Sequence, residues 1–234
     1  MSGLLVQIPE VVPAGDAAAL LVIGEEMSLE VMAQSHSLAR AIKGEQLGGV
    51  RAVVIGRSSV MVHYDPLVLS LEEIRAVVER LVGQGLEAVA PEGRLRELPT
   101  VYGGSYGPDL PYAAQYHHMS EEEVVQLQSG ATYVVCSLGF APGQPLLMGL
   151  PRELVLPRRD NPRAQVPAGS VLIASQTSLY SLPNPTGWWL IGRIPIKLFD
   201  PSADPPTFLL AGDRVRFIPI SEKEYLRLGG ETAK

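Results

Sequence analysis

Short apolar runs separated by proline and glycine turns dominate the second half of the chain. Three of these runs, Val134–Leu138, Val171–Ala174 and Trp188–Ile191, are each flanked by turn residues. A further run, Arg214–Ile220, follows a Gly-Asp turn. Closely spaced apolar runs with this punctuation are typical of short strands in an all-β unit. Roughly eight such strands with few helices predict a closed or nearly closed β-barrel.

The first part of the chain alternates between strand and helix patterns. The predicted order is strand, helix, strand, strand, helix, over Ala18–Ile23, Ser28–Lys43, Val50–Ile55, Val60–Tyr64 and Ser70–Gly83. The second helix opens with a capping box, Ser70-Leu71-Glu72-Glu73, in which the serine and the last glutamate satisfy each other's backbone amides. A closing strand is expected near Leu86–Val89 or Leu95–Leu98. This order predicts a small α+β unit.

The prolines mark a boundary between these two patterns. Only four of the 20 prolines precede Pro99. Proline interrupts helices and favours turns, so the change in its density separates helix-tolerant sequence from turn-rich sequence. We therefore expect two domains, an α/β domain over residues 1–95 and a barrel domain over residues 96–234.

Composition and charge narrow the function classes. The net charge of −6 argues against a general nucleic-acid binder, which would carry a basic excess. No apolar run approaches the roughly 18 residues of a membrane span, and no leader-like segment follows Met1. The single cysteine, Cys136, fits a reducing compartment. We expect a cytoplasmic protein that binds neither nucleic acid nor membrane.

The turns of the barrel part carry a cluster of polar and aromatic side chains. We expect six of them to converge on one concave substrate-binding site: Arg158, Arg163, Gln176, Tyr180, Trp188 and Arg193. Arginine grips a carboxylate or phosphate with two hydrogen bonds, glutamine pairs with an amide, and aromatic rings form flat walls. The loop at Gly139, Phe140, Pro142 and Gly143 is expected at the rim. In the alternative interpretation the arginines form a solvated turn and Trp188 fills the barrel.

Two further segments precede the barrel strands. The glycine-rich loop Tyr102–Leu110 either presents backbone amides to an anion or serves as a turn between domains. Asp109 is expected to cap a short helix. A second capping box, Ser120-Glu121-Glu122-Glu123, opens a helix that ends by Gly130.

Catalytic groups are not assignable from the sequence. It contains no nucleophile elbow, no phosphate-binding Gly-Lys-Ser/Thr loop and no Cys/His spacing typical of a metal site. We therefore expect no intrinsic cofactor and no autonomous acyl-transfer activity.

From Tyr102 onward, ordered short motifs over about 120 residues resemble a known family. They are Tyr102-Gly103-Gly104, Tyr106-Gly107-Pro108-Asp109-Leu110, Gly139-Phe140-Ala141-Pro142-Gly143, Pro157-Arg158, Pro162-Arg163, Val166–Val171, Ile173-Ala174, Gln176-Thr177, Tyr180, Gly187-Trp188, Leu190–Arg193 and Gly212–Phe217. The family shares the carboxyltransferase C/D-type domain. It includes the B subunits of 5-oxoprolinases, the first subunits of allophanate hydrolases and Kip-type inhibitors of sporulation histidine kinases.

The resemblance implies a cyclophilin-like barrel and a working complex. The activity it implies is ATP-dependent hydrolysis of 5-oxoproline to glutamate. That activity is shared with a C-type carboxyltransferase-domain protein and a third, LamB/YcsF-type subunit, and which of them binds ATP is left open. The alternative within the family is an inhibitory binding protein for a histidine kinase. A third alternative, prolyl isomerisation, rests on fold analogy alone.

The sequence departs from the family pattern at several positions. Gln144, Leu146 and Met148 replace a Phe, a Tyr and a Gly. Gln128 stands where a His is usual in the helix before the barrel. Ser181 replaces a Pro, and Thr186 replaces a Gly.

Overall fold

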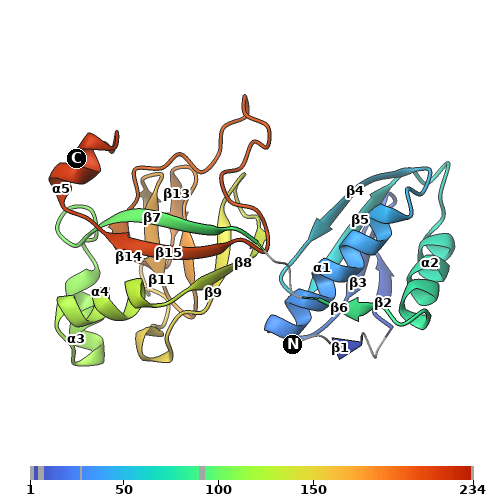
Figure 1. The fold of residues 1–234 in the computed structure, drawn as a ribbon, viewed down its shortest axis with the longest axis horizontal. Helices are drawn as coiled ribbons and strands as arrows, with labels where there is room; N and C mark the ends of the chain where they lie inside the picture. The colour runs from blue at the N-terminus through green and yellow to red at the C-terminus, as the bar shows by residue number, and fades with distance from the viewer. Residues whose placement is uncertain (1–2, 5–7, 27, 90–92, 233–234) are drawn as a thin grey trace. The chain divides into compact units, whose positions relative to one another are not determined.

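The computed structural model describes residues 3–4, 8–26, 28–89 and 93–232. The chain divides into two compact units, residues 1–92 and 93–234 (Figure 1). The first contains a sheet with helices and the second a closed barrel. The predicted fold class, an α+β part followed by a mainly β part, is confirmed.

An antiparallel four-stranded sheet forms the centre of the first unit. Its strand order is β2 (Glu10–Pro13), β3 (Ala18–Val22), β5 (Ser59–Tyr64) and β4 (Val50–Ile55). Strand β2 was not among the predicted elements. It is short and ends in Pro13, and it lies at the edge of the sheet, where proline is tolerated. A separate short pair joins β1 (Gly3–Leu4) to β6 (Glu87–Ala88).

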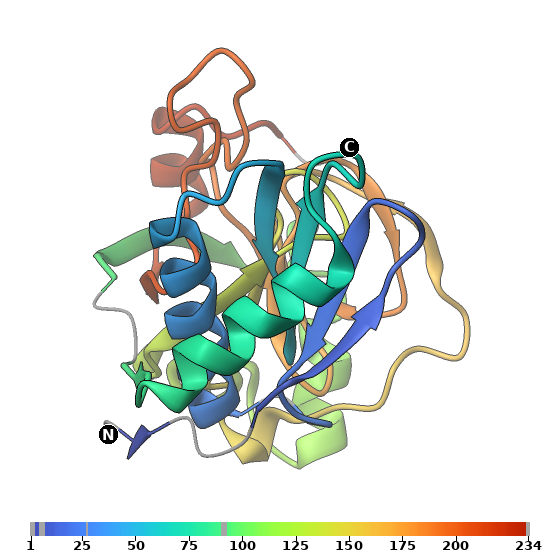
Figure 2. The same ribbon diagram turned by 90° about the vertical axis from the view of Figure 1, so that its right-hand side faces the viewer.

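Helices α1 (Leu29–Gly44) and α2 (Leu71–Gly83) pack on this sheet (Figure 2). Their predicted starts are confirmed. Ser28 caps α1 by accepting a hydrogen bond from the Val31 amide, and the capping box of Ser70 and Glu73 is present. Along β5, Val60, Val62 and Tyr64 are buried, while the alternate residues Ser59, Met61 and His63 are partly exposed. This alternation turns one face of the sheet toward the helices.

A closed barrel of seven strands, among the described residues, forms the second unit. Its order is β11 (Ser170–Ile173), β12 (Thr177–Leu179), β9 (Pro145–Met148), β8 (Tyr133–Leu138), β15 (Arg214–Pro219), β7 (Leu95–Tyr102) and β14 (Trp189–Arg193). Neighbouring strands are antiparallel except β7 and β15, which run parallel. A two-stranded ribbon, β10 (Arg163–Val166) with β13 (Asn184–Thr186), accompanies the barrel.

Four short helical segments belong to the same unit. They are α3 (Leu110–His117), α4 (Glu121–Gly130), the 3₁₀ turn η1 (Arg152–Leu154) and α5 (Glu222–Arg227). The second predicted capping box, Ser120 with Glu123, is confirmed at the start of α4. No helix in the described part of the chain is long and apolar enough to cross a membrane.

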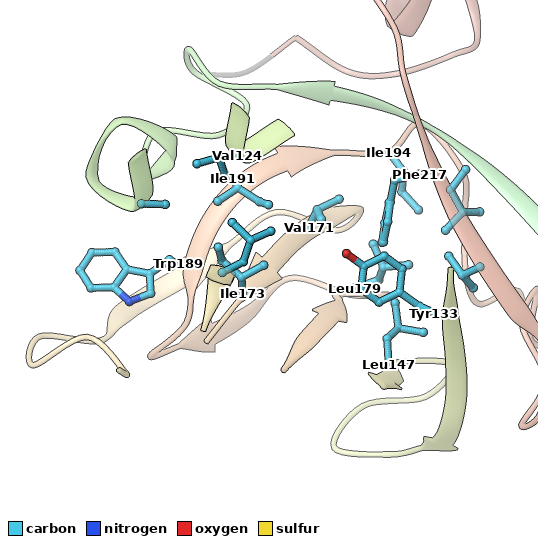
Figure 3. Close-up of a cluster of buried hydrophobic side chains, with 14 of the residues drawn as sticks. Val124, Tyr133, Leu147, Val171, Ile173, Leu179, Trp189, Ile191, Ile194 and Phe217 are labelled. Carbon is cyan, nitrogen blue, oxygen red and sulfur yellow. The ribbon is translucent and has the colours of Figure 1, made fainter. Parts of the chain in front are cut away.

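The main core of this unit fills the barrel (Figure 3). Val171 and Ile173 of β11 contribute to it, whereas Leu172 between them belongs to a smaller cluster with Val166, Tyr180 and Leu190. Successive strand residues face opposite sides of a sheet, so the smaller cluster lies on the outer side of the barrel wall.

Asp213, directly before the last strand β15, forms hydrogen bonds that connect it to the segment before the first barrel strand β7. Its buried carboxylate accepts hydrogen bonds from the amides of Arg94, at 3.1 Å, and Leu210, at 3.0 Å. A Cβ atom on Gly93 would lie 2.0 Å from the carbonyl oxygen of Gly212, so only glycine fits there. The Gly-Asp turn that follows residue 211 is therefore structural.

The predicted boundary between domains is testable by limited proteolysis. We expect a non-specific protease to cleave first between residues 88 and 102, and to leave two resistant fragments. Residues 90–92 of this interval lie outside the described residues. Because β7 pairs with β15 from Leu95 onward, the cut should precede Leu95. Mass spectrometry of the fragments locates it, and a chain that is cut first elsewhere would contradict the boundary.

Candidate functional site

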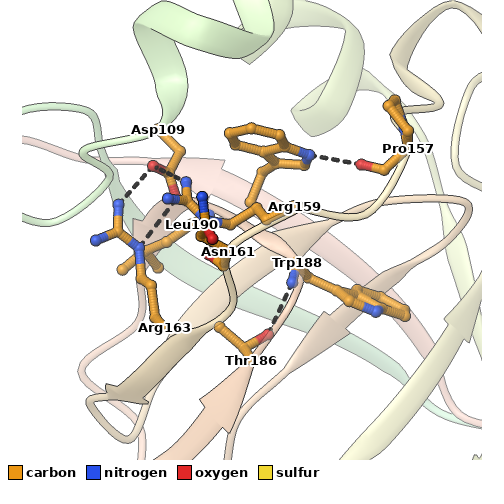
Figure 4. Close-up of polar contacts among 9 residues, drawn as sticks. Asp109, Pro157, Arg159, Asn161, Arg163, Thr186, Trp188 and Leu190 are labelled. Carbon is orange, nitrogen blue, oxygen red and sulfur yellow. Dashed lines mark hydrogen bonds and ion pairs between the residues drawn. The ribbon is translucent and has the colours of Figure 1, made fainter.

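Asp109 is the centre of a buried polar cluster (Figure 4). Its Oδ1 atom lies 2.8 Å from Nη1 of Arg159 and 2.5 Å from Nη2 of Arg163. Its Oδ2 atom accepts the Leu190 amide at 2.9 Å and faces Nε of Arg163 at 3.4 Å. One carboxylate therefore ties the loop before α3 to strand β14 and to both arginine-bearing segments.

The role predicted for Asp109 as a helix cap is wrong in its chemistry. Asp109 occupies the N-cap position of α3, but its side chain makes no capping hydrogen bond. Its carboxylate turns instead to two guanidinium groups, which hold it more strongly because both partners are charged. Pro111 in the first turn of α3 removes one of the amides that a cap would satisfy.

Trp189 extends this cluster with stacked rings. Its indole lies parallel to the Tyr112 ring, with centroids 3.8 Å apart, and the Arg159 guanidinium lies 4.7 Å from the indole centroid. The indole N–H donates to the Pro157 carbonyl at 2.7 Å. Arg159 is thus oriented by both a carboxylate and an aromatic face, a geometry that fixes its planar group.

A cavity of about 170 Å³ lies beside the Asp109 cluster. We call it the arginine cavity, and it is lined by Ser105, Tyr106, Arg163, Gln165, Val166, Pro167, Ser170, Leu190 and Arg193. Its volume is below the roughly 300–1,000 Å³ of sites for drug-sized ligands. It therefore suits a small organic anion better than a nucleotide.

Arg193 supplies the second cation of the arginine cavity. Its side chain is buried, and Nε donates to the Ala168 carbonyl at 3.0 Å. Its Nη2 lies 3.7 Å from the carboxylate of Glu231, whose own side chain is 87% exposed. The outer edge of Arg193 is therefore accessible to a carboxylate group. With Arg159 and Arg163 sharing the single buried carboxylate of Asp109, the local charge is positive.

The structure brings only part of the predicted set of six to this cavity. Arg163 and Arg193 line it. Tyr180 and Trp188 pack in the neighbouring apolar cluster, whose members Val166 and Leu190 form part of the cavity wall. The other two predicted residues lie outside the lining.

Arg158 and Gln176 are the two predicted site residues that lie outside both the cavity lining and the neighbouring apolar cluster. Arg158 is exposed and makes no ion pair among the described residues, while the next residue, Arg159, reaches Asp109. Gln176 is half-buried in the turn between β11 and β12. Ser170 and Arg193 mark the opposite end of β11 from this turn, and both line the cavity.

The loop from Gly139 to Gly143 does not line the arginine cavity. It connects β8 to β9 and is closed by a hydrogen bond from the Gly139 amide to the Gln144 carbonyl. Gly143 has a φ of +70°, and a Cβ atom there would lie 2.9 Å from Cβ of Phe199. The ring of Phe140 lies 6.2 Å from that of Tyr180. The loop therefore lies next to the apolar cluster of Tyr180, two of whose members form part of the cavity wall.

In the glycine-rich loop before α3, three backbone amides already donate hydrogen bonds to carbonyl groups of the protein. Those of Tyr106 and Gly107 donate to the Gly103 carbonyl, and that of Gly103 donates to Ile191. A Cβ atom on Gly107 would lie 1.9 Å from the Ile191 oxygen. The anion-binding interpretation is therefore wrong for these three amides, and the loop instead packs closely on β14.

Tyr102 and Gln128 form a second buried polar contact, beneath α4. The Tyr102 hydroxyl donates to Oε1 of Gln128, and the Tyr133 hydroxyl donates to the Gln128 carbonyl at 2.8 Å. Burial raises the pKa of Tyr102 well above its usual value, so its hydroxyl remains neutral. No group of three or more His, Cys, Asp or Glu side chains able to hold a metal ion occurs in the described residues.

Fold and site together define a carboxyltransferase-type subunit. Residues 9–209 match the family model for the carboxyltransferase domain, subdomains C and D, and the chain belongs to this family. It is 39% identical over 222 residues to the 5-oxoprolinase B subunit of Bacillus subtilis (strain 168), an alignment that covers 90% of this chain and 92% of that protein. It is 52% identical over 137 residues to the 5-oxoprolinase B subunit of Escherichia coli O157:H7, covering 58% and 63%.

A solved structure shares the fold. The crystal structure of TTHA0988 superposes with a TM-score of 0.76 at 34% identity. The match covers 88% of this chain and 40% of that one, so this chain spans about two fifths of TTHA0988.

Four residues of the site were not predicted as members: Asp109, Tyr112, Arg159 and Trp189. Pairs of adjacent residues caused two of these omissions, because Arg158 precedes Arg159 and Trp188 precedes Trp189. Along a strand such neighbours face opposite sides, and the apolar run Trp188–Ile191, which continues into β14, hides which side is inward. The one available sequence signal for Asp109 was that it is the single charged residue in the loop Tyr102–Leu110.

Proposed function

We propose that this chain is the B subunit of an ATP-dependent 5-oxoprolinase, a hydrolase complex that opens 5-oxoproline to glutamate. The observation that carries the proposal is the 39% identity to the Bacillus subtilis protein across nearly the full length of both chains. The family membership is consistent with it, because residues 9–209 are covered by one carboxyltransferase-domain model.

The arginine cavity supports this assignment chemically. 5-Oxoproline is a small ring with one carboxylate, and Arg163 and Arg193 supply two guanidinium groups in a cavity of about 170 Å³. We propose that these two arginines hold the substrate carboxylate, while Asp109 and Arg159 fix the orientation of Arg163. The contact between Arg193 and Glu231 supports carboxylate binding at this edge.

The remaining chemistry is proposed to come from partner subunits. The sequence has no phosphate-binding Gly-Lys-Ser/Thr loop and no nucleophile elbow, so activation by ATP and attack on the lactam need other groups. We propose a C-type carboxyltransferase-domain protein and a LamB/YcsF-type protein as these partners.

Reconstitution tests this function. We expect the purified chain alone to show no ATP hydrolysis and no glutamate release from 5-oxoproline. Mixed with both partners, it should support ATP-dependent glutamate formation, measured with a glutamate dehydrogenase assay. A complex that lacks this chain serves as the control. Full activity without this chain, or no activity with it, would contradict the proposal.

A further inference from the structure

Arg193 carries a buried positive charge with a single carboxylate partner among the described residues. Its side chain is 10% exposed, and its Nε atom already donates to the Ala168 carbonyl at 3.0 Å. The carboxylate partner is Glu231, whose Oε2 atom lies 3.7 Å from Nη2 of Arg193. A protein rarely keeps a charge this deeply buried unless an opposite charge accompanies it. Glu231 therefore serves as the counter-ion of Arg193.

The contact between Arg193 and Glu231 is loose on the side of Glu231. The 3.7 Å separation exceeds the usual length of a hydrogen bond between nitrogen and oxygen, and the Glu231 side chain is 87% exposed. An ion pair with an exposed partner adds little stability, because water competes for that partner. The buried guanidinium is thus neutralised by a carboxylate that can leave at a small cost.

Helix α5 determines where this carboxylate lies. Tyr225 of α5 is 1% exposed, and its ring meets the Tyr106 ring edge-on, with centroids 5.0 Å apart. The Tyr106 hydroxyl donates to Oε1 of Glu222, in the first turn of α5, at 2.9 Å. Tyr106 also lines the arginine cavity. The helix is therefore anchored on a wall of that cavity.

Two glycines connect α5 to Glu231. Gly229 has a φ of +88°, in the left-handed region that glycine favours after the end of a helix. The Gly230 amide donates to the Tyr225 carbonyl at 3.0 Å, and a Cβ atom on Gly230 would lie 2.2 Å from Cε1 of Tyr225. The chain therefore stays close to the buried Tyr225 ring up to the residue before Glu231.

We propose that Glu231 is a built-in competitor for the arginine cavity: its carboxylate neutralises Arg193 in the ligand-free protein, and a carboxylate ligand must displace it. Both carboxylates need the same outer edge of the guanidinium, because Nε is bonded to Ala168. The ligand gains charge-assisted hydrogen bonds in a buried position, whereas Glu231 gives up only an exposed contact. Because the ligand binds only molecules in which Glu231 has left Arg193, the competition lowers the apparent affinity.

The displacement leaves α5 in place. The contacts of Tyr106 with Tyr225 and Glu222 do not involve Glu231, so only the end of the segment has to move. The identification of the ligand as 5-oxoproline rests on the proposed function. The competition itself requires only a small carboxylate and no partner subunit.

Titration of the full chain with cyclopentanecarboxylate tests this competition. The probe is a five-membered ring with one carboxylate and no amide, and its binding is followed by NMR at constant ionic strength. Glu231→Gln should bind it about two- to fivefold more tightly than wild type, the range expected when a weak, exposed ion pair is removed. The matched control is Glu153→Gln, the same change at an exposed glutamate of η1, which should leave the affinity unchanged.

The Nε–H resonance of Arg193 gives an independent readout. In the free chain, Glu231→Gln should shift this resonance, because the charge beside the guanidinium is removed. In the chain saturated with cyclopentanecarboxylate, wild type and Glu231→Gln should give the same resonance, because the probe has replaced Glu231 in both.

Three outcomes would overturn the proposal. The first is an affinity of Glu231→Gln that equals that of Glu153→Gln or is lower than that of wild type. The second is a difference between the Arg193 resonances at saturation, since Glu231 would then remain on Arg193 beside the ligand. The third is a failure of both wild type and Glu231→Gln to bind the probe. Inactivity of the reconstituted complex would instead refute the proposed function, whatever the result with cyclopentanecarboxylate.

Discussion

Replacing Asp109 with alanine should lower the free energy of unfolding by about 3 kcal/mol. The change leaves Arg159 and Arg163 without their shared carboxylate and leaves the Leu190 amide without an acceptor. Breaking a buried ion pair from one side typically costs about 3–5 kcal/mol. We expect the lower end because the two arginine side chains are 21% and 32% exposed and so remain partly hydrated.

Urea unfolding of the full chain measures this loss. Asp109→Asn should fall between wild type and Asp109→Ala, because the amide oxygen keeps one acceptor but not the charge. The matched control is Asp160→Ala, which removes an exposed aspartate in the segment that carries Arg159 and Arg163. Its free energy of unfolding should lie within about 0.5 kcal/mol of wild type. If Asp109→Ala is as stable as that control, the cluster is not structural.

Replacing Arg163 with alanine should weaken 5-oxoproline binding by about tenfold or more. A charge-assisted hydrogen bond to a carboxylate contributes roughly 1.5–3 kcal/mol, and each 1.4 kcal/mol corresponds to a factor of ten. Arg163→Lys should restore only part of the affinity, because an ammonium lacks the planar fork that binds two oxygens. The cost in stability should stay near 1–2 kcal/mol, since Arg159 and the Leu190 amide still hold Asp109.

Calorimetry on the chain, and KM for 5-oxoproline in the reconstituted complex, measure this effect. Arg158→Ala is the matched control, because Arg158 is exposed and five residues from Arg163 in the same turn-rich segment. Equal affinities of the Arg163 and Arg158 variants would remove Arg163 from the substrate site. A loss of binding that Arg163→Lys restores fully would show that charge alone is needed.

The elements of the fold with strong local signals were predictable from the sequence. The capping boxes at Ser70 and Ser120 fix their helices through contacts within four residues, so a short window of sequence contains the whole signal. Strand β2 lacked such a signal because it ends in a proline and depends on pairing with β3. Strand β14 ends at Arg193, and Pro195, two residues later, cannot donate to a ladder.

The site was less predictable because long-range contacts assemble it. Arg159 and Arg163 reach Asp109 across 50 and 54 residues. No local sequence pattern predicts that Asp109 binds arginines rather than caps its own helix. Nor does one predict that Arg159, rather than Arg158, points toward Asp109. The arginine and aromatic composition did indicate the right region, since Arg163 and Arg193 line the cavity.

The parallel pairing of β15 with β7 has a consequence for synthesis on the ribosome. Strand β15 lies between β7 and β8, so the barrel wall has a gap until the residues after Arg214 emerge. The nascent chain then exposes two unpaired strand edges and the apolar interior behind them, a state that invites association with other chains. The contact between Arg94 and Asp213 spans 119 residues, so closure is a late, non-local event whose rate is limited by chain topology.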